Sequence, residues 1–174
     1  MHKQQLHDLL YTNHTAFIQL MQGMNESNFV KKVADKWTPA QQAKHIHQSV
    51  HPVNLAFRLP NFLLNLVFGK ANRPSKTYQQ LIDKYKSKLA AGGKAPARFI
   101  PKAIPYLEKE KLIKQLQKDI AILCRLTLQK NETDLDTYIL PHPLLGKITL
   151  REMLYFTCYH VTHHQQLVQQ IINS

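Results

Sequence analysis

Four long stretches of the sequence carry apolar residues at helical spacing, and this pattern limits the possible folds more than any other feature. The stretches cover residues 4–22, 39–59, 108–129 and 150–172. Only five glycines occur in 174 residues, which argues against a sheet-rich fold with many tight turns. Amphipathic helices bury their apolar faces by packing together, so the sequence predicts an all-α, four-helix bundle forming one domain over residues 1–174.

Residues that begin or bend helices support two of these assignments. Thr38 can cap the second long helix, and Pro39 then stands at its first helical position. Thr149 can cap the last one, with Glu152 three residues on as the second half of a capping box. Pro52 lies inside the second helix, so we expect a kink just before it.

The remaining segments connect the long helices. We expect a polar connection over residues 25–36, a loop over 90–105 and an irregular connection over 131–146. Short helices are expected at 61–68 and 75–90. The second and third long helices are therefore joined by a helical crossover insert.

Most of the net positive charge lies in this crossover, within the basic part that spans residues 70–105. The formal net charge of the chain is +12, and residues 70–102 hold nine Lys or Arg against Asp83 alone. A solvated helix face is the plainer interpretation, and a site for an anionic partner is the other. The stretch lacks interleaved aromatic residues and any DNA-reading motif, so we do not expect nucleic acid to bind.

Other features exclude whole classes of protein. Cys124 and Cys158 do not make a disulfide framework, and we expect both to be core thiols. The longest apolar stretch, residues 62–68, is far below the ~20 residues of a membrane-spanning helix. No signal-peptide pattern is present, so we expect a cytoplasmic protein without a membrane partner. Bundles often pair through an apolar helix face, and a homodimer is the expected assembly.

Histidines are the candidate residues for a functional site. His160 and His164 are four apart on the last helix, a spacing at which two imidazoles can reach one metal ion. Both lie in or beside the apolar stripe and should point into the bundle, whereas His163 lies on its flank. Buried imidazoles need partners, which a metal ion or hydrogen bonds to other side chains would supply.

A reactive metal site needs a third protein ligand, and spacing alone does not select it. The candidates are His45, His47 and His51 on the second helix and His142 before the last one. His47 flanks the apolar stripe of the second helix, while His45 lies further round on the other side. The helical-wheel position therefore weakly favours His47.

Three segments resemble the DinB/YfiT-like superfamily. Trp37–Ile46, followed by Ser49, looks like the W-S/T-P-x-E/Q-x-L-x-H-L…S opening of its second helix. Pro141–Leu154 is similar to its HP.fG.lt..ell segment. His160–Leu167 is similar to its closing H-x-x-x-H. The resemblance covers the second and fourth long helices well and the basic crossover poorly.

The resemblance implies a four-helix bundle of mostly up-up-down-down order, with a metal held by three histidines. At the matching positions of this chain these are His45, His160 and His164. The family pattern therefore selects His45 rather than His47 as the third ligand. A kink at Pro52 can rotate the two halves of the second long helix against each other, which would let His45 take that place.

The family also implies a function. Its members are metal-dependent hydrolases, or thiol S-transferases and isomerases that use a low-molecular-weight thiol. For this chain we expect a small-molecule substrate and a divalent transition metal, Zn²⁺ or Ni²⁺ ahead of Fe²⁺ or Mn²⁺. No catalytic residue is assigned: Gln41 stands where the family usually has Glu, and Glu152 lies two turns before His160. The basic crossover could attract an anionic thiol or substrate.

A second class of function is also compatible with the sequence. The chain could be a binding or stress-associated protein without turnover, whose histidines hold a structural metal or only hydrogen bonds. Its basic stretch would then dock a polyanion. Docking at a membrane surface through residues 62–68, beside Lys70 and Arg73, is a third interpretation.

Overall fold

The computed structural model describes residues 1–174, and the chain is predominantly helical, as the sequence predicts. Its four long helices are α1 (Lys3–Gln22), α3 (Pro39–Arg58), α6 (Lys109–Gln129) and α8 (Leu150–Ile172). Thr38 and Thr149 cap α3 and α8 through complete capping boxes, as predicted. Neither these helices nor the shorter ones combine the length and hydrophobicity needed to cross a bilayer.

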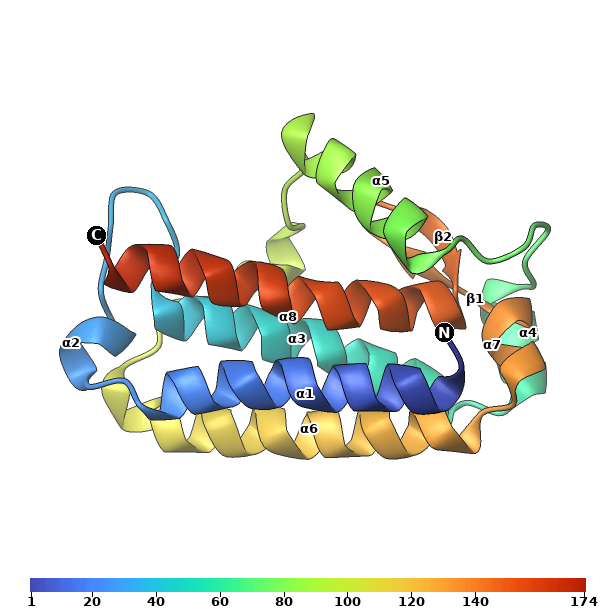
Figure 1. Cartoon of the computed structure of the whole chain (residues 1–174), viewed down its shortest axis with the longest axis horizontal. Helices are drawn as coiled ribbons and strands as arrows, with labels where there is room; N and C mark the ends of the chain where they lie inside the picture. Colours follow the sequence, from blue (N-terminus) through green and yellow to red (C-terminus); the bar gives the residue numbers. More distant parts are fainter.

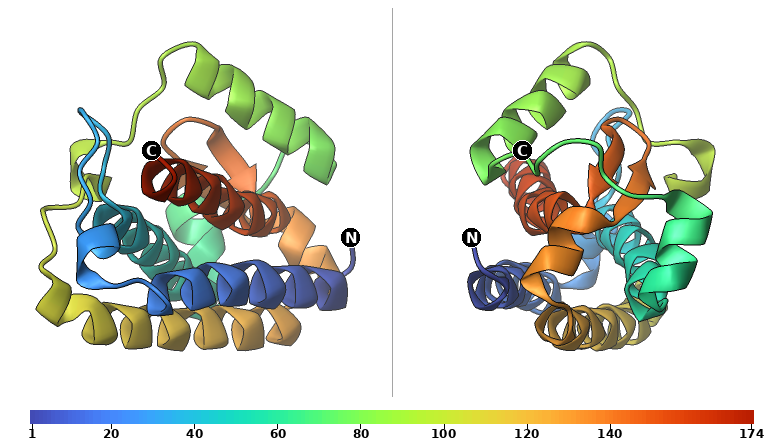
Figure 2. Two further views of the ribbon diagram at one scale, coloured as in Figure 1. Left: turned by 60° about the vertical axis from the view of Figure 1, so that its left-hand side comes forward. Right: turned by 90° about the vertical axis from the view of Figure 1, so that its right-hand side faces the viewer.

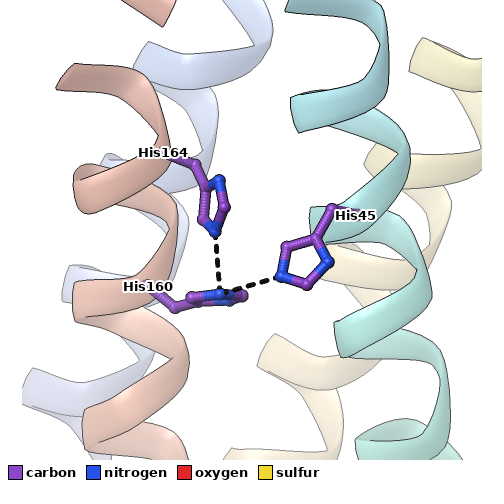
Figure 3. A group of neighbouring side chains, drawn as sticks. All are labelled: His45, His160 and His164. Carbon is purple, nitrogen blue, oxygen red and sulfur yellow. Dashed lines mark hydrogen bonds between the residues drawn. The ribbon is translucent and has the colours of Figure 1, made fainter. Parts of the chain in front are cut away.

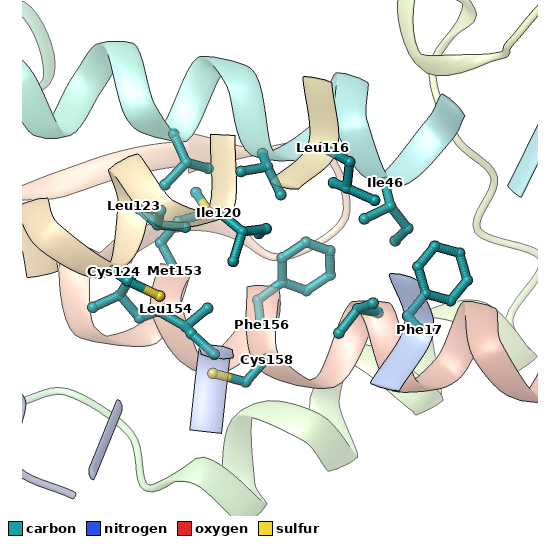
Figure 4. Close-up of a cluster of buried hydrophobic side chains, with 14 of the residues drawn as sticks. Phe17, Ile46, Leu116, Ile120, Leu123, Cys124, Met153, Leu154, Phe156 and Cys158 are labelled. Carbon is teal, nitrogen blue, oxygen red and sulfur yellow. The ribbon is translucent and has the colours of Figure 1, made fainter. Parts of the chain in front are cut away.

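The long helices pack side by side around one apolar core (Figure 1). α1 and α3 each contact both α6 and α8, so α1 lies diagonally across from α3 (Figure 2). The core contains the stripes expected from the sequence, and Figure 4 shows that Phe17 of α1, Ile46 of α3, Leu116 of α6 and Leu154 of α8 all contribute to one buried cluster. Cys124 and Cys158 are both buried in it, as predicted.

The helices follow one another in the order up, down, down, up, which corrects the expected up-up-down-down order. Arg151, at the start of α8, donates to the carbonyl of Met1 at 2.7 Å, so α1 and α8 run parallel. Lys109, at the start of α6, donates to the carbonyl of Gln22 at the end of α1, so these two run antiparallel. Lys130, just after the end of α6, donates to the carbonyl of Leu59 at the end of α3 at 3.3 Å, so α3 and α6 run parallel and the crossover returns along the helices between them.

The crossover connects α3 to α6 and lies along one side of the long helices (Figure 1). It contains α4 (Asn61–Phe68), α5 (Tyr78–Ala90) and the 3₁₀ turns η1 (Ala97–Phe99) and η2 (Tyr106–Glu108). The bounds of α4 are those predicted. α5 begins three residues later than predicted, because Thr77 caps it and forms a capping box with Gln80. The expected loop over 90–105 holds η1.

Glu152 fastens the start of the crossover to α8. Its side chain is fully buried, and Arg73 donates two hydrogen bonds to it, at 2.7 and 2.8 Å. The backbone N–H groups of Lys76 and Thr149 donate to the same carboxylate at 2.7 and 2.9 Å. Burial alone would raise the pKa of Glu152, but these hydrogen bonds outweigh it and lower the pKa. The buried charge is therefore fully paired.

Two connections contain regular structure that the sequence analysis missed. The polar connection after α1 includes α2 (Glu26–Phe29), capped by the Asn25 side chain. The segment expected to be irregular holds α7 (Glu132–Thr137) and a hairpin of β1 (Ile139–His142) and β2 (Gly146–Thr149).

The hairpin runs antiparallel, with Ile139 opposite Thr149 and His142 opposite Gly146. Gly146 has a φ of +77°, a conformation that the turn requires and that glycine adopts without strain. Pro141 made a strand look unfavourable in the sequence, since proline has no N–H to donate to the hydrogen-bond ladder between strands. In a two-stranded ribbon every strand is an edge strand, so that missing donor is tolerated.

The buried histidine of α1 gives a prediction about acid stability. His14 donates from Nδ1 to the carbonyl of Leu10 at 2.8 Å, and its buried Nε2 has no partner. Burial lowers the pKa of His14 from 6.5 to about 4. The unfolded chain therefore takes up a proton first, and stability falls as the pH drops from 6.5 towards 4, by roughly 3 kcal/mol from this residue.

We expect His14→Leu to lose less stability than the wild type as the pH drops from about 6.5 to about 4. The measurement is the free energy of unfolding in urea at about pH 7 and about pH 4 for both proteins. A variant that loses as much stability on acidification as the wild type would contradict the assignment.

Candidate metal centre

Three imidazoles from two helices converge on one point in the protein interior (Figure 3). His45 projects from α3, and His160 and His164 project from successive turns of α8. Nε2 of His160 lies 3.2 Å from Nε2 of His45 and 3.0 Å from Nε2 of His164. One nitrogen of each ring lies within 4.8 Å of the others, and all three residues are buried. The structure thus brings together the three residues that the family pattern selects.

Hydrogen bonds on the far side of two rings set which nitrogen carries the proton. Nδ1 of His45 lies 2.7 Å from the carbonyl oxygen of Phe99, which can only accept, so Nδ1 is the donor. Nδ1 of His164 donates to the side-chain oxygen of Gln42. Neutral His45 and His164 therefore both direct an Nε2 lone pair towards His160.

This arrangement suits a divalent cation better than it suits hydrogen bonds among the three rings. A single proton on Nε2 of His160 can satisfy only one of the two lone pairs that face it. A zinc-like ion with Zn–N bonds of about 2.0–2.1 Å holds tetrahedral ligands about 3.3 Å apart. Two of the three observed separations, 3.0 and 3.2 Å, are close to that value, and the third is within 4.8 Å. A buried three-histidine group of this kind could bind a divalent metal.

The surroundings keep the three rings neutral, as metal ligands must be. Burial lowers the pKa of His45, although the hydrogen bond to Phe99 offsets part of the effect. Burial, and then the neighbouring histidines, hold the pKa values of His160 and His164 well below their ordinary range. Trp37 covers the cluster at the start of α3, with its ring nearly parallel to that of His164 at 6.4 Å.

The other two histidines of α3 face a different helix. Nε2 of His47 and Nδ1 of His51 lie 3.5 and 3.3 Å from one carboxylate oxygen of Asp119 on α6. The helical-wheel preference for His47 as the third ligand is therefore wrong. α3 packs between α6 and α8, so both edges of its stripe are buried, and only the edge bearing His45 faces α8.

His142 is not part of the cluster either, although it lies nearby. It ends β1, and its Nδ1 accepts the backbone N–H groups of Leu144 and Leu145 at 3.2 and 3.1 Å. Burial, and to a smaller extent the charge of Lys84, lower the pKa of His142 to about 4. The ring therefore stays neutral at physiological pH.

A cavity of about 300 Å³ opens onto the three histidines. Its walls come from α3, α5, α8, the hairpin and the residues around η1, so the crossover encloses one side of the site. Apolar groups dominate the lining, among them Phe99, Leu140 and Phe156. His163, which the sequence places on the flank of the stripe, also lines the cavity and is half-buried.

Several residues important to the site could not be assigned from the sequence. Gln42 and Phe99 orient two of the imidazoles, and Tyr85 lines the cavity from α5. Gln42 stands three residues before His45, at a position that the family's second-helix motif leaves unspecified, so the motif gave no signal for it. Phe99 acts through its backbone carbonyl, which any residue supplies, so no residue-type signal existed.

A helical protein with a buried three-histidine cluster on the wall of a cavity belongs to the class of candidate metalloproteins. The chain is a member of the DinB superfamily: the sequence profile of that family matches residues 9–168. No curated protein and no solved structure matches the chain significantly. Membership in the family therefore rests on the profile match.

Proposed function

We propose that this protein is a metal-dependent enzyme in which His45, His160 and His164 hold a divalent transition metal within a four-helix bundle. The observation that carries the proposal is the convergence of three neutral Nε2 atoms at one buried point beside a cavity. Three protein ligands leave coordination positions open, which is typical of catalytic rather than structural sites. The family profile supports the same interpretation.

The bound ion would supply Lewis-acid chemistry, lowering the pKa of a water molecule or of a low-molecular-weight thiol. The chain itself orients the ligands, through Phe99 for His45 and Gln42 for His164. Ligand orientation by outer hydrogen bonds of this kind raises metal affinity and fixes the tautomer. The apolar cavity excludes bulk water from a bound substrate.

The residues present favour a thiol S-transferase or a simple hydrolase. No carboxylate lines the cavity, and the oxygens of Glu152 are fully occupied by Arg73 and two backbone N–H groups. A thiol reaction requires little acid–base assistance from the protein, because a thiolate is already a strong nucleophile. Zn²⁺ and Ni²⁺ are the ions we propose first, since imidazole suits both.

Substitution with Co²⁺ tests whether the site has an open position. The protein is stripped of metal, loaded with Co²⁺ and titrated with 2-mercaptoethanol, and the absorption spectrum is recorded. We expect a new sulfur-to-metal charge-transfer band with the thiol and a shift of the visible bands with azide. Ethylene glycol, which has oxygen in place of sulfur, should give no such band.

The matched control is His163→Ala, which removes a histidine of the cavity that is not in the cluster and should retain the response. If neither thiol nor azide changes the spectrum of the Co²⁺ protein, no coordination position is open and the enzymatic proposal fails.

A further inference from the structure

The cavity presents hydrogen-bond donors that nothing in the protein accepts. Nδ1 of His142 accepts two backbone N–H groups, so the proton of the neutral ring is on Nε2. No protein atom accepts a hydrogen bond from that Nε2, and His142 lines the cavity. The hairpin turn thus fixes the tautomer and directs one N–H donor to the site.

Tyr85 supplies a second donor from the crossover. Its side chain is almost fully buried against Phe156, with the ring centroids 5.1 Å apart, and its hydroxyl has no hydrogen-bond partner in the protein. The Tyr85 ring also packs edge-on to His142 at 6.3 Å and to His160 at 6.4 Å. Tyr85 thus lines the same cavity as the histidine cluster and brings a free hydroxyl to it.

The charged side chains around the cavity are all cationic. Lys94 and Arg98 line it from the segment around η1, and no Asp or Glu is among the lining residues. Arg98 lies over the ring of Phe99 at 4.9 Å, which places it next to the residue that orients His45. Both cations are exposed, so they can attract a ligand from solvent and still reach it at the opening.

From these observations, and resting on the proposed metal site, we infer that the substrate carries an anionic oxygen group, a carboxylate or a phosphate, next to an apolar body. The anion accepts hydrogen bonds from Nε2 of His142 and the hydroxyl of Tyr85, while Lys94 and Arg98 balance its charge. The apolar walls cover the rest of the molecule. A cationic substrate would be repelled by Lys94 and Arg98.

Calorimetry with simple probes tests this inference. Benzoate, phenyl phosphate and neutral benzyl alcohol are titrated into the zinc-loaded protein and into protein treated with a chelator. We expect at least one anion to bind about tenfold or more tightly than benzyl alcohol, as hydrogen bonds to a charged group imply. Whether benzoate or phenyl phosphate binds more tightly identifies the kind of anion.

Three variants assign the effect to residues. His142→Asn retains an oxygen that can accept the turn N–H groups but lacks the donor in the cavity, and Tyr85→Phe removes only the hydroxyl. Each should weaken anion binding about tenfold with unchanged metal content. Arg98→Gln should weaken binding and reduce its salt dependence. The control Arg125→Gln, an exposed arginine on α6, should change nothing.

Anions that bind no more tightly than benzyl alcohol would overturn the inference, and so would anion binding that His142→Asn and Tyr85→Phe leave unchanged. The metal proposal is judged separately. Anion binding that depends on these residues in a protein that takes up no metal would uphold the inference while the proposed enzyme function fails.

Discussion

Replacing His160 by alanine is expected to abolish metal binding, because His160 is the ring that both other imidazoles face. Wild-type protein loaded with Zn²⁺ and then desalted should retain about one ion per chain, and His160→Ala less than about a tenth of that. Elemental analysis of both proteins gives the ratio. The same sub-stoichiometric metal content in wild type and variant would remove the basis of the proposed function.

The metal should also stabilise the fold, because the cluster joins α3 to α8 and the unfolded chain offers no such site. Free metal at 100 times its Kd stabilises by about 2.7 kcal/mol, which raises the Tm of a protein of this size by roughly 5–10 °C. Wild type should show this shift and His160→Ala should not. His163→Ala, on the same helix but outside the cluster, should keep both the metal and the shift.

Replacing Glu152 by alanine is expected to be the most destabilising single change for the fold. It removes a fully buried carboxylate and leaves Arg73 without its partner and the Lys76 and Thr149 N–H groups without acceptors. Breaking one side of a buried ion pair costs about 3–5 kcal/mol, a third or more of the stability of a typical domain. Tm should fall by about 10 °C.

Chemical denaturation of three variants measures this effect. Glu152→Gln keeps one acceptor oxygen without the charge and should lie between the wild type and Glu152→Ala. Glu110→Ala, an exposed acid on α6 without an ion pair, should stay within about 0.5 kcal/mol of the wild type. A cost below about 1 kcal/mol for Glu152→Ala would show that the crossover is held by other contacts.

The crossover explains why a strongly basic segment occurs in a small helical protein. The sequence alone left a solvated helix face and an anion site as alternatives for its charge. In the structure the segment is divided: Arg73 pairs with buried Glu152, while Lys94 and Arg98 line the cavity. Part of the charge is therefore structural, and part lies where a ligand would bind.

Two of the wrong expectations are local, and the other two concern contacts between distant segments. Thr77 sets the start of α5 and could be recognised locally, but the hairpin at residues 139–149 was obscured by Pro141. The up-up-down-down order followed the family resemblance, whereas contacts between the ends of distant helices show the direction of α6. The helical wheel weakly favoured His47 over His45 because it does not show which neighbouring helix each edge faces.

The sequence by itself determined the four long helices, their capping residues and the pairing of His160 with His164, because these depend on the 3.6-residue repeat and on neighbours within one or two turns. The family motif selected His45, but only the tertiary structure showed that it faces α8, that Glu152 fastens the crossover and that His142 and Tyr85 border the cavity. Each of these depends on packing between segments far apart in the chain, which local periodicity does not encode.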